Sequence, residues 1–188
     1  MKMLALMVLL GAATSSGPVP RTQLQFAGRQ FSIELPPAYQ FQAQASPSPV
    51  MKTYAFTAAA HADGTHGLIQ VSLVDLRAMP RGEPEMSLAA FAAGMIDGVR
   101  RRRAQWQETQ QVVTVAGVSA TQIQWSGSNG PSPEFAGQNV PALMHGTMLV
   151  GIKDHIGFVL HTQDLDTYWP KSGPRGERAL RTFTFQSP

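Results

Sequence analysis

The sequence contains no cysteine, and Asp, Glu, Lys and Arg together make up only 14% of its 188 residues. The absence of cysteine excludes disulfide scaffolds, thiol catalysis, iron–sulfur clusters and cysteine-ligated zinc sites, and we expect no lipid anchor on an N-terminal cysteine. The charged fraction is too low for a coiled coil, whereas the hydrophobic fraction of 43% is too high for a disordered chain. The length therefore predicts a single folded domain.

The sequence also has no Gly-x-Ser-x-Gly elbow, no His-Glu-x-x-His zinc motif and no glycine-rich phosphate loop that follows a strand. Its carboxylates are scattered, and no pair has the spacing typical of acid–base catalysis. We therefore expect no cofactor, and a non-enzymatic protein fits the sequence better than an enzyme. An enzyme whose site is assembled from distant residues stays open as an alternative.

The first 15 residues have the pattern of a secretory signal peptide. Lys2 precedes the apolar run Met3–Leu10, and small residues follow it. The run is too short to span a bilayer, which takes roughly 20 apolar residues. We expect cleavage near residue 15, export to the periplasm or the outside of the cell, a flexible leader at 16–22 and one domain at 23–188. The alternative is that the apolar run is an ordinary buried first strand.

Alternation of apolar and polar residues predicts a meander of antiparallel strands. Phe31 and Ile33 alternate with polar residues, as do Ile69 and Val71 in a later segment. Segments 143–152 and 156–162 form a predicted hairpin that turns at Asp154-His155. In that hairpin His161 falls opposite Met148.

One segment has the 3.6-residue period of a helix instead. Ser87 stands where an N-cap is expected, and apolar residues recur at spacings of three and four along 87–106, with Arg100–Arg103 in its C-terminal half. A second helix is predicted near 175–182. The fold class is therefore α+β, an antiparallel sheet of about six to seven strands flanked by helices. The expected core includes Phe31, Ile33, Ile69, Val71, Phe91, Met95, Ile123, Val150, Phe158 and Phe183.

Four segments in this order resemble the PsbP-like α/β/α sandwich superfamily: FSIELPPAYQ at 31–40, VTVAGVSATQIQW at 113–125, MLVGIKDHIGFVLHTQ at 148–163 and RALRTFTF at 178–185. The resemblance covers roughly residues 23–186. It implies the sandwich fold and a binding or assembly-accessory role through an envelope protein or a small ligand. It brings no catalytic residues with it.

Two groups of residues are candidate contact sites. Phe135, on a Gly-, Ser- and Pro-rich loop at 126–141, and the aromatic pair Tyr168 and Trp169 could line a ligand groove, or they could plug the open end of the sandwich. Arg100, Arg101, Arg102 and Arg103 could make a weak contact with an anionic membrane surface or an acidic partner, or they could be a solvated helix end. We expect no nucleic-acid partner, because the protein is exported and its net charge is small.

The competing functional class is a periplasmic metal-binding protein or a hydrolase. His61, Asp63 and His66 lie in the turn HADGTH and have side chains suited to zinc. The same letters also suit a solvated surface turn. Copper is not expected at Met144, His145 and Met148, because on a strand the two methionines share a face about 13 Å apart while the histidine points the other way.

Overall fold

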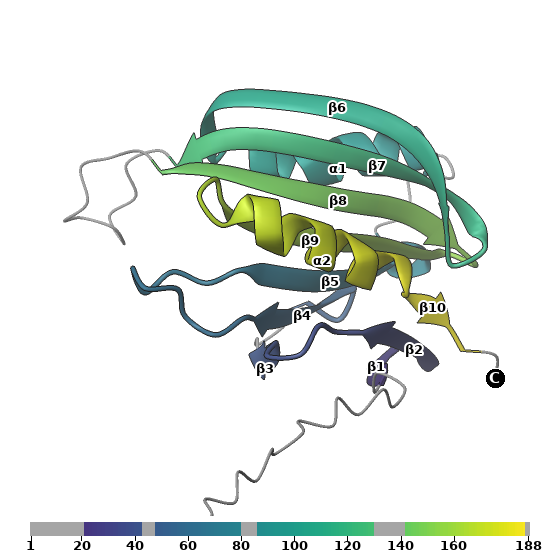
Figure 1. Cartoon of the computed structure of the whole chain (residues 1–188). Helices are drawn as coiled ribbons and strands as arrows, with labels where there is room; N and C mark the ends of the chain where they lie inside the picture. The colour runs from purple at the N-terminus through teal and green to yellow at the C-terminus, as the bar shows by residue number, and fades with distance from the viewer. Residues whose placement is uncertain (1–20, 43–47, 80–85, 130–141, 187–188) are drawn as a thin grey trace, which may run out of the picture.

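The computed structural model describes residues 21–42, 48–79, 86–129 and 142–186. Two antiparallel sheets, two α-helices and a short 3₁₀ helix make up this part of the chain (Figure 1). The elements in chain order are β1 (Arg21–Phe26), β2 (Arg29–Glu34), β3 (Gln40–Gln42), β4 (Met51–Thr57), β5 (Leu68–Asp75), η1 (Leu76–Ala78), α1 (Leu88–Arg100), β6 (Arg103–Val115), β7 (Val118–Asn129), β8 (Leu143–Lys153), β9 (Ile156–Leu165), α2 (Trp169–Arg181) and β10 (Thr184–Phe185).

The larger sheet has seven strands in the order β3-β4-β5-β9-β8-β7-β6. All its pairings are antiparallel, and the predicted 143–162 hairpin is confirmed with Met148 opposite His161. Its two-residue turn, Asp154-His155, has positive φ at both residues, and so does Ala116-Gly117 between β6 and β7. Such turns match the twist of the strands that they join. They define one end of the sheet, which we call the hairpin end.

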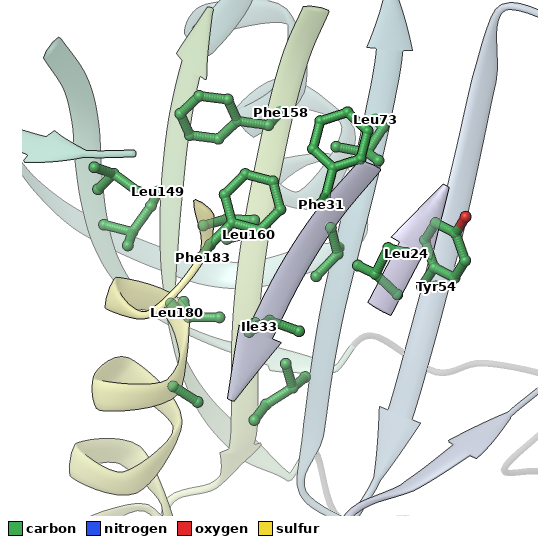
Figure 2. Packing of buried hydrophobic residues seen from close by; sticks show 14 of the residues in the cluster. Leu24, Phe31, Ile33, Tyr54, Leu73, Leu149, Phe158, Leu160, Leu180 and Phe183 are labelled. Carbon is green, nitrogen blue, oxygen red and sulfur yellow. The ribbon is translucent and has the colours of Figure 1, made fainter. Parts of the chain in front are cut away.

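The molecule has three layers, as an α/β/α sandwich requires. Helix α1 packs on one face of the seven-stranded sheet, while α2 and the small sheet β1-β2-β10 cover the other face (Figure 1). Between α2, β2 and the large sheet lies an aromatic and aliphatic core, part of which is drawn in Figure 2. Nine of the ten expected core residues are buried; Met95 is half-buried at the edge of the α1 layer.

Helix α1 begins as predicted and ends earlier. The Ser87 hydroxyl accepts a hydrogen bond from the Ala90 amide, which confirms the N-cap. The predicted extension to residue 106 is wrong, because the chain leaves the helix after Arg100 and pairs with β7 from Arg103 onward. Pairing with β7 along a 13-residue strand satisfies the backbone of this segment, in place of the roughly two further helical turns that were predicted.

Helix α2 begins at Trp169, six residues before the predicted start at 175. Two glycines and the interior Pro174 disfavour a helix here on propensity alone. In the structure Gly173 lies under the Trp169 ring and Gly176 lies against Thr162 of β9, where an added Cβ would come within 2.6 Å and 2.2 Å of those side chains. Gly176 thus lets the helix lie close to the sheet and Gly173 leaves room for the Trp169 ring, so packing outweighs propensity.

Two differences concern the small sheet β1-β2-β10. Strand β1 begins at Arg21, so the last two residues of the range 16–22, which we had assigned to a leader, belong to the small sheet. The closing strand β10 pairs with β2 of this small sheet and not with the large one. The expected signal peptide lies outside the described residues. Among the residues described, no helix is long and apolar enough to cross a membrane.

Candidate functional site

The end of the large sheet opposite the hairpin end gathers rings and carboxylates from three segments. The connection 58–67, the last residues of β9 with the start of β8, and the first turn of α2 meet there. We call this group the ring–carboxylate cluster; its members are His61, Asp63, His145, Asp164, Asp166, Tyr168 and Trp169.

The turn HADGTH holds the first part of the cluster. The His61 amide donates to the Thr65 carbonyl (2.8 Å) and the Gly64 amide donates to the His61 carbonyl (3.0 Å). Asp63 accepts from the amide and the hydroxyl of Thr65 at 3.0 Å and 2.6 Å. These bonds close the turn and fix the direction in which His61 points.

His61 points at a buried carboxylate. Asp164 on β9 is 1% exposed, and both of its carboxylate oxygens lie 3.1 Å from Nε2 of His61. The Leu165 amide also donates to Asp164, at 2.8 Å. A buried carboxylate needs such donors, because without them its desolvation is costly. The pair therefore holds the imidazole ring in one orientation.

Tyr168 lies flat on the His61 ring, with 3.7 Å between ring centroids and 10° between the planes. Its hydroxyl also interacts with the Asp63 carboxylate. Loss of hydration, together with this neighbouring charge, raises the pKa of Tyr168, while the hydrogen bonds from Thr65 hold the pKa of Asp63 below its usual value. Tyr168 thus links the turn to the start of α2.

A second ring pair lies beside the first. Nε2 of His145 is 2.7 Å from Oδ1 of Asp166, and the His145 ring stacks on Trp169 with centroids 6.0 Å apart. His145 is also the cross-strand partner of Asp164, so the two pairs share one face of the sheet. Tyr168, the N-cap residue of α2, and Trp169, its first residue, are therefore each held against a histidine that is paired with an aspartate.

The buried side of the cluster has no spare room. An added Cβ at Gly67 would lie 2.9 Å from Oδ2 of Asp164 and 3.1 Å from the Tyr39 hydroxyl. Burial raises the pKa of Tyr39, the Asp164 charge raises it further, and Arg175 of α2 opposes both. Tyr39 therefore lies between the cluster and the basic side of α2.

The structure joins residues that the sequence assigned to competing functions. His61 and Asp63, from the metal alternative, contact Tyr168, from the proposed binding site. His66 points elsewhere and lies 3.0 Å from the Ala58 carbonyl through Nδ1. In the described part of the chain, no three His, Asp or Glu side chains are grouped to hold a metal ion.

The other candidates are separate from the cluster. Phe135 and residues 130–141 of the expected loop lie outside the described residues, while residues 126–129 are the end of β7. Met144 and Met148 pack in the α1 layer, on the face opposite His145.

The four arginines do not all lie on the helix as expected. Arg100 pairs with Asp97 and Glu108 at 3.2 Å and 2.8 Å, and this contact with Glu108 raises its pKa. Arg103 is half-buried over the Trp125 ring, and burial lowers its pKa. Arg101 and Arg102, on the turn between α1 and β6, are exposed. The segment is therefore a helix end joined to an edge strand.

Asp164 is the central residue that the sequence reasoning missed. In the sequence Asp164 is one of several scattered acidic residues. It lies four and six residues after Leu160 and Phe158, and this even spacing on a strand predicts a side chain on the same core-facing side. A carboxylate on an inward position requires a partner, and that requirement was the available signal. The identity of the partner, 103 residues away in the chain, was not readable.

Comparison with known proteins supports the fold alone. No protein-family model matches the sequence, and no curated protein matches it. Among solved structures, the cyanobacterial PsbP (CyanoP) of Synechocystis sp. PCC 6803 aligns with a TM-score of 0.58 at 10% identity, over 94% of this chain and 99% of CyanoP. LpqN, involved in cell envelope biogenesis of Mycobacterium tuberculosis, aligns at 0.55 and 14% identity, over 89% and 91% of the two chains.

The Ran-binding protein Mog1p of Saccharomyces cerevisiae aligns with a TM-score of 0.54 at 9% identity, over 88% of this chain and 95% of Mog1p. LpqN and Mog1p have different described roles, so the feature that all three proteins share with this chain is the arrangement of strands and helices. The layers, the seven-stranded antiparallel sheet and these alignments together show that the chain has the PsbP-like α/β/α sandwich fold.

Proposed function

We propose that the protein is an exported, non-enzymatic binding or accessory protein and that the ring–carboxylate cluster is its contact surface. The observation that carries the proposal is the paired arrangement at the start of α2. Tyr168 and Trp169, both half-exposed, are each fixed by a stacked histidine that an aspartate holds. Aromatic side chains that are already immobile lose little conformational entropy on binding, so they are suitable anchors for a partner.

The similar structures support a binding role in general terms. One is described as a Ran-binding protein and another as involved in cell envelope biogenesis. Export rests on the signal-peptide pattern of residues 1–15, which is consistent with an envelope partner.

The experiment is a cross-linked pull-down from the native envelope fraction, using protein whose intact mass shows that it begins near residue 16. Tyr168→Ala with Trp169→Ala should lose a partner that the wild type retains. Val112→Ala is the matched control, because it removes an exposed apolar side chain on the edge strand β6, which belongs to a different part of the surface. Thermal melts show whether each variant is folded. Equal recovery of the same partners by the double variant would overturn the proposal.

The metal-binding or hydrolase alternative has its own measurement. Protein purified without chelator should carry no stoichiometric zinc, copper or iron. Stoichiometric metal that disappears in a His61→Ala, His66→Ala variant would favour the alternative and contradict the binding role as stated.

A further inference from the structure

A groove separate from the ring–carboxylate cluster runs between α2 and the chain that leaves β2. Its volume is about 450 Å³, within the range of small-molecule sites. Leu35, Pro36 and Pro37 form one wall, and Ala179 lies on the helix side. Figure 2 shows Ile33 near the end of β2 in the same cluster as Leu180 of α2, so a rigid core lies directly beneath.

Hydrogen bonds fix the two walls relative to each other. The Thr182 hydroxyl accepts from the Glu34 amide at 2.8 Å and donates to the Ala179 carbonyl at 2.7 Å. This bridge joins the end of β2 to the last turn of α2. The groove therefore exists before any ligand arrives, which lowers the entropic cost of binding.

The groove carries positive charge that its surroundings do not neutralise. Arg175 and Arg178 line it from the helix, three residues apart and hence on neighbouring positions of one side. Within the described residues, neither guanidinium makes a side-chain hydrogen bond or an ion pair, and both residues are exposed. Glu34 also lines the groove, but its carboxylate is paired with Arg21 at 2.9 Å.

Other charged residues of α2, unlike Arg175 and Arg178, are hydrogen-bonded to the large sheet. Arg181 donates to Gln122 at 2.7 Å, and Glu177 accepts from Thr147 at 2.5 Å and from Gln124 at 3.2 Å. These side chains are used in holding the helix to the sheet. Two adjacent cations without such a role repel each other, and a bound anion removes that repulsion.

From the apolar wall and the two available guanidiniums, we propose that this groove binds a small organic anion, a carboxylate or phosphate monoester carried on an apolar body. Guanidinium groups hold both kinds of anion through paired N–H donors. The apolar body lies along Leu35, Pro36 and Pro37. This site goes beyond the proposed contact surface and does not depend on it.

The test measures binding of decanoate and octyl phosphate to the full-length mature protein by calorimetry. Both should bind, and Arg175→Gln with Arg178→Gln should weaken them at least tenfold. Arg101→Gln is the matched control, since it removes one exposed charge of the same kind on the opposite face of the sheet, and it should leave binding unchanged. In wild-type amide spectra, added decanoate should shift the signals of Leu35, Ala179 and Thr182, a readout that does not depend on any variant folding.

Four outcomes would overturn the proposal. Acetate or inorganic phosphate binding as tightly as the amphiphiles would mean an adventitious ion only. Octyl glucoside binding equally well would mean an apolar contact without a role for the arginines. An acidic peptide that binds at least tenfold more tightly would indicate a macromolecular partner. Unshifted signals for all three reporter residues would place any binding elsewhere.

Discussion

The two halves of β9 are both largely buried but differ in chemistry. Ile156–Leu160 is entirely apolar and contributes to the cores on both faces of the sheet. His161–Leu165 continues the same strand between the same neighbours, yet its buried residues are His161, Thr162 and Asp164. The strand thus changes from packing to polar contacts at its midpoint.

The position of that change explains where the candidate site is. The apolar half lies towards the hairpin end, where two-residue turns close the strands and leave little chain for contacts. The polar half lies at the other end, where the long connection 58–67 brings in His61 and the chain turns from β9 into α2 at Tyr168 and Trp169. Side chains from distant segments can converge only where the connections are long enough to carry them. The comparison teaches that stability and contact chemistry occupy opposite ends of one sheet.

The largest expected effect concerns His161 in the polar half. Burial lowers its pKa to about 3, the Arg103 charge acts in the same direction, and its Nε2 has no hydrogen-bond partner within the described residues. The unfolded chain takes up this proton near pH 6.5, whereas the folded protein does not. The free energy of unfolding should therefore fall by about 1.4 kcal/mol per pH unit below pH 6.5.

Urea denaturation at pH 6.5, 5.5 and 4.5 measures this slope, to which carboxylates of the unfolded chain add only at the lowest of these pH values. His161→Leu should flatten it, and His66→Gln, at an exposed position, should preserve it. A wild type that is equally stable at pH 6.5 and 4.5 would show that the buried ring accepts its proton without cost.

A smaller effect is expected where the polar end is most tightly packed. Gly67→Ala places a methyl group 2.9 Å from the Asp164 carboxylate, so the acid must move away from His61. We expect a loss of about 2 kcal/mol in the free energy of unfolding, measured by urea denaturation. Gly94→Ala in α1, where an added Cβ meets nothing within 4 Å, is the control and should stabilise by about 0.5 to 1 kcal/mol. Similar results for both variants would mean that the cluster tolerates displacement.

The smallest effect belongs to the hairpin end. His155 has φ of +65° in its turn and is exposed, so His155→Gly removes backbone strain without removing a buried side chain. The expected gain is about 0.5 to 1 kcal/mol by thermal melting. Gly117→Ala, at φ of +78° in the equivalent turn, should cost a similar amount. If either variant changed the set of partners recovered in the pull-down, stability and contact chemistry would not be confined to opposite ends of the sheet.

The sequence was most informative where one period governs a whole segment. Phe31 and Ile33 alternate with polar residues, and so do Ile69 and Val71. This alternation identified strands whose inward side chains are buried. The cap at Ser87 and the turn at Asp154-His155 are local features, so they too were readable. These elements depend on neighbours in the chain, which a sequence displays directly.

Prediction failed where contacts between distant residues decide the structure. Trp106 follows the helical period, but it stacks on Trp125 of the next strand with centroids 5.1 Å apart. The glycines of α2 argue against a helix until Thr162 is seen behind Gly176. Of the candidate site, Tyr168 and Trp169 could be named from the sequence. Their pairing with His61 and His145 could not, because it arises only when the sheet is assembled.

The edge strand β6 carries a consequence for behaviour at high concentration. Its 13 residues form one border of the large sheet, while β3, at the other border, has only three. Near its start, an irregularity between Ala104 and Gln107 interrupts regular pairing, and the Arg103 charge points inward over a tryptophan. Both features obstruct a second sheet from adding to this edge. From Thr109 to Val115 the strand has no charged residue. Resistance of this edge to association with a second molecule therefore depends on Arg103 and on the irregularity between Ala104 and Gln107.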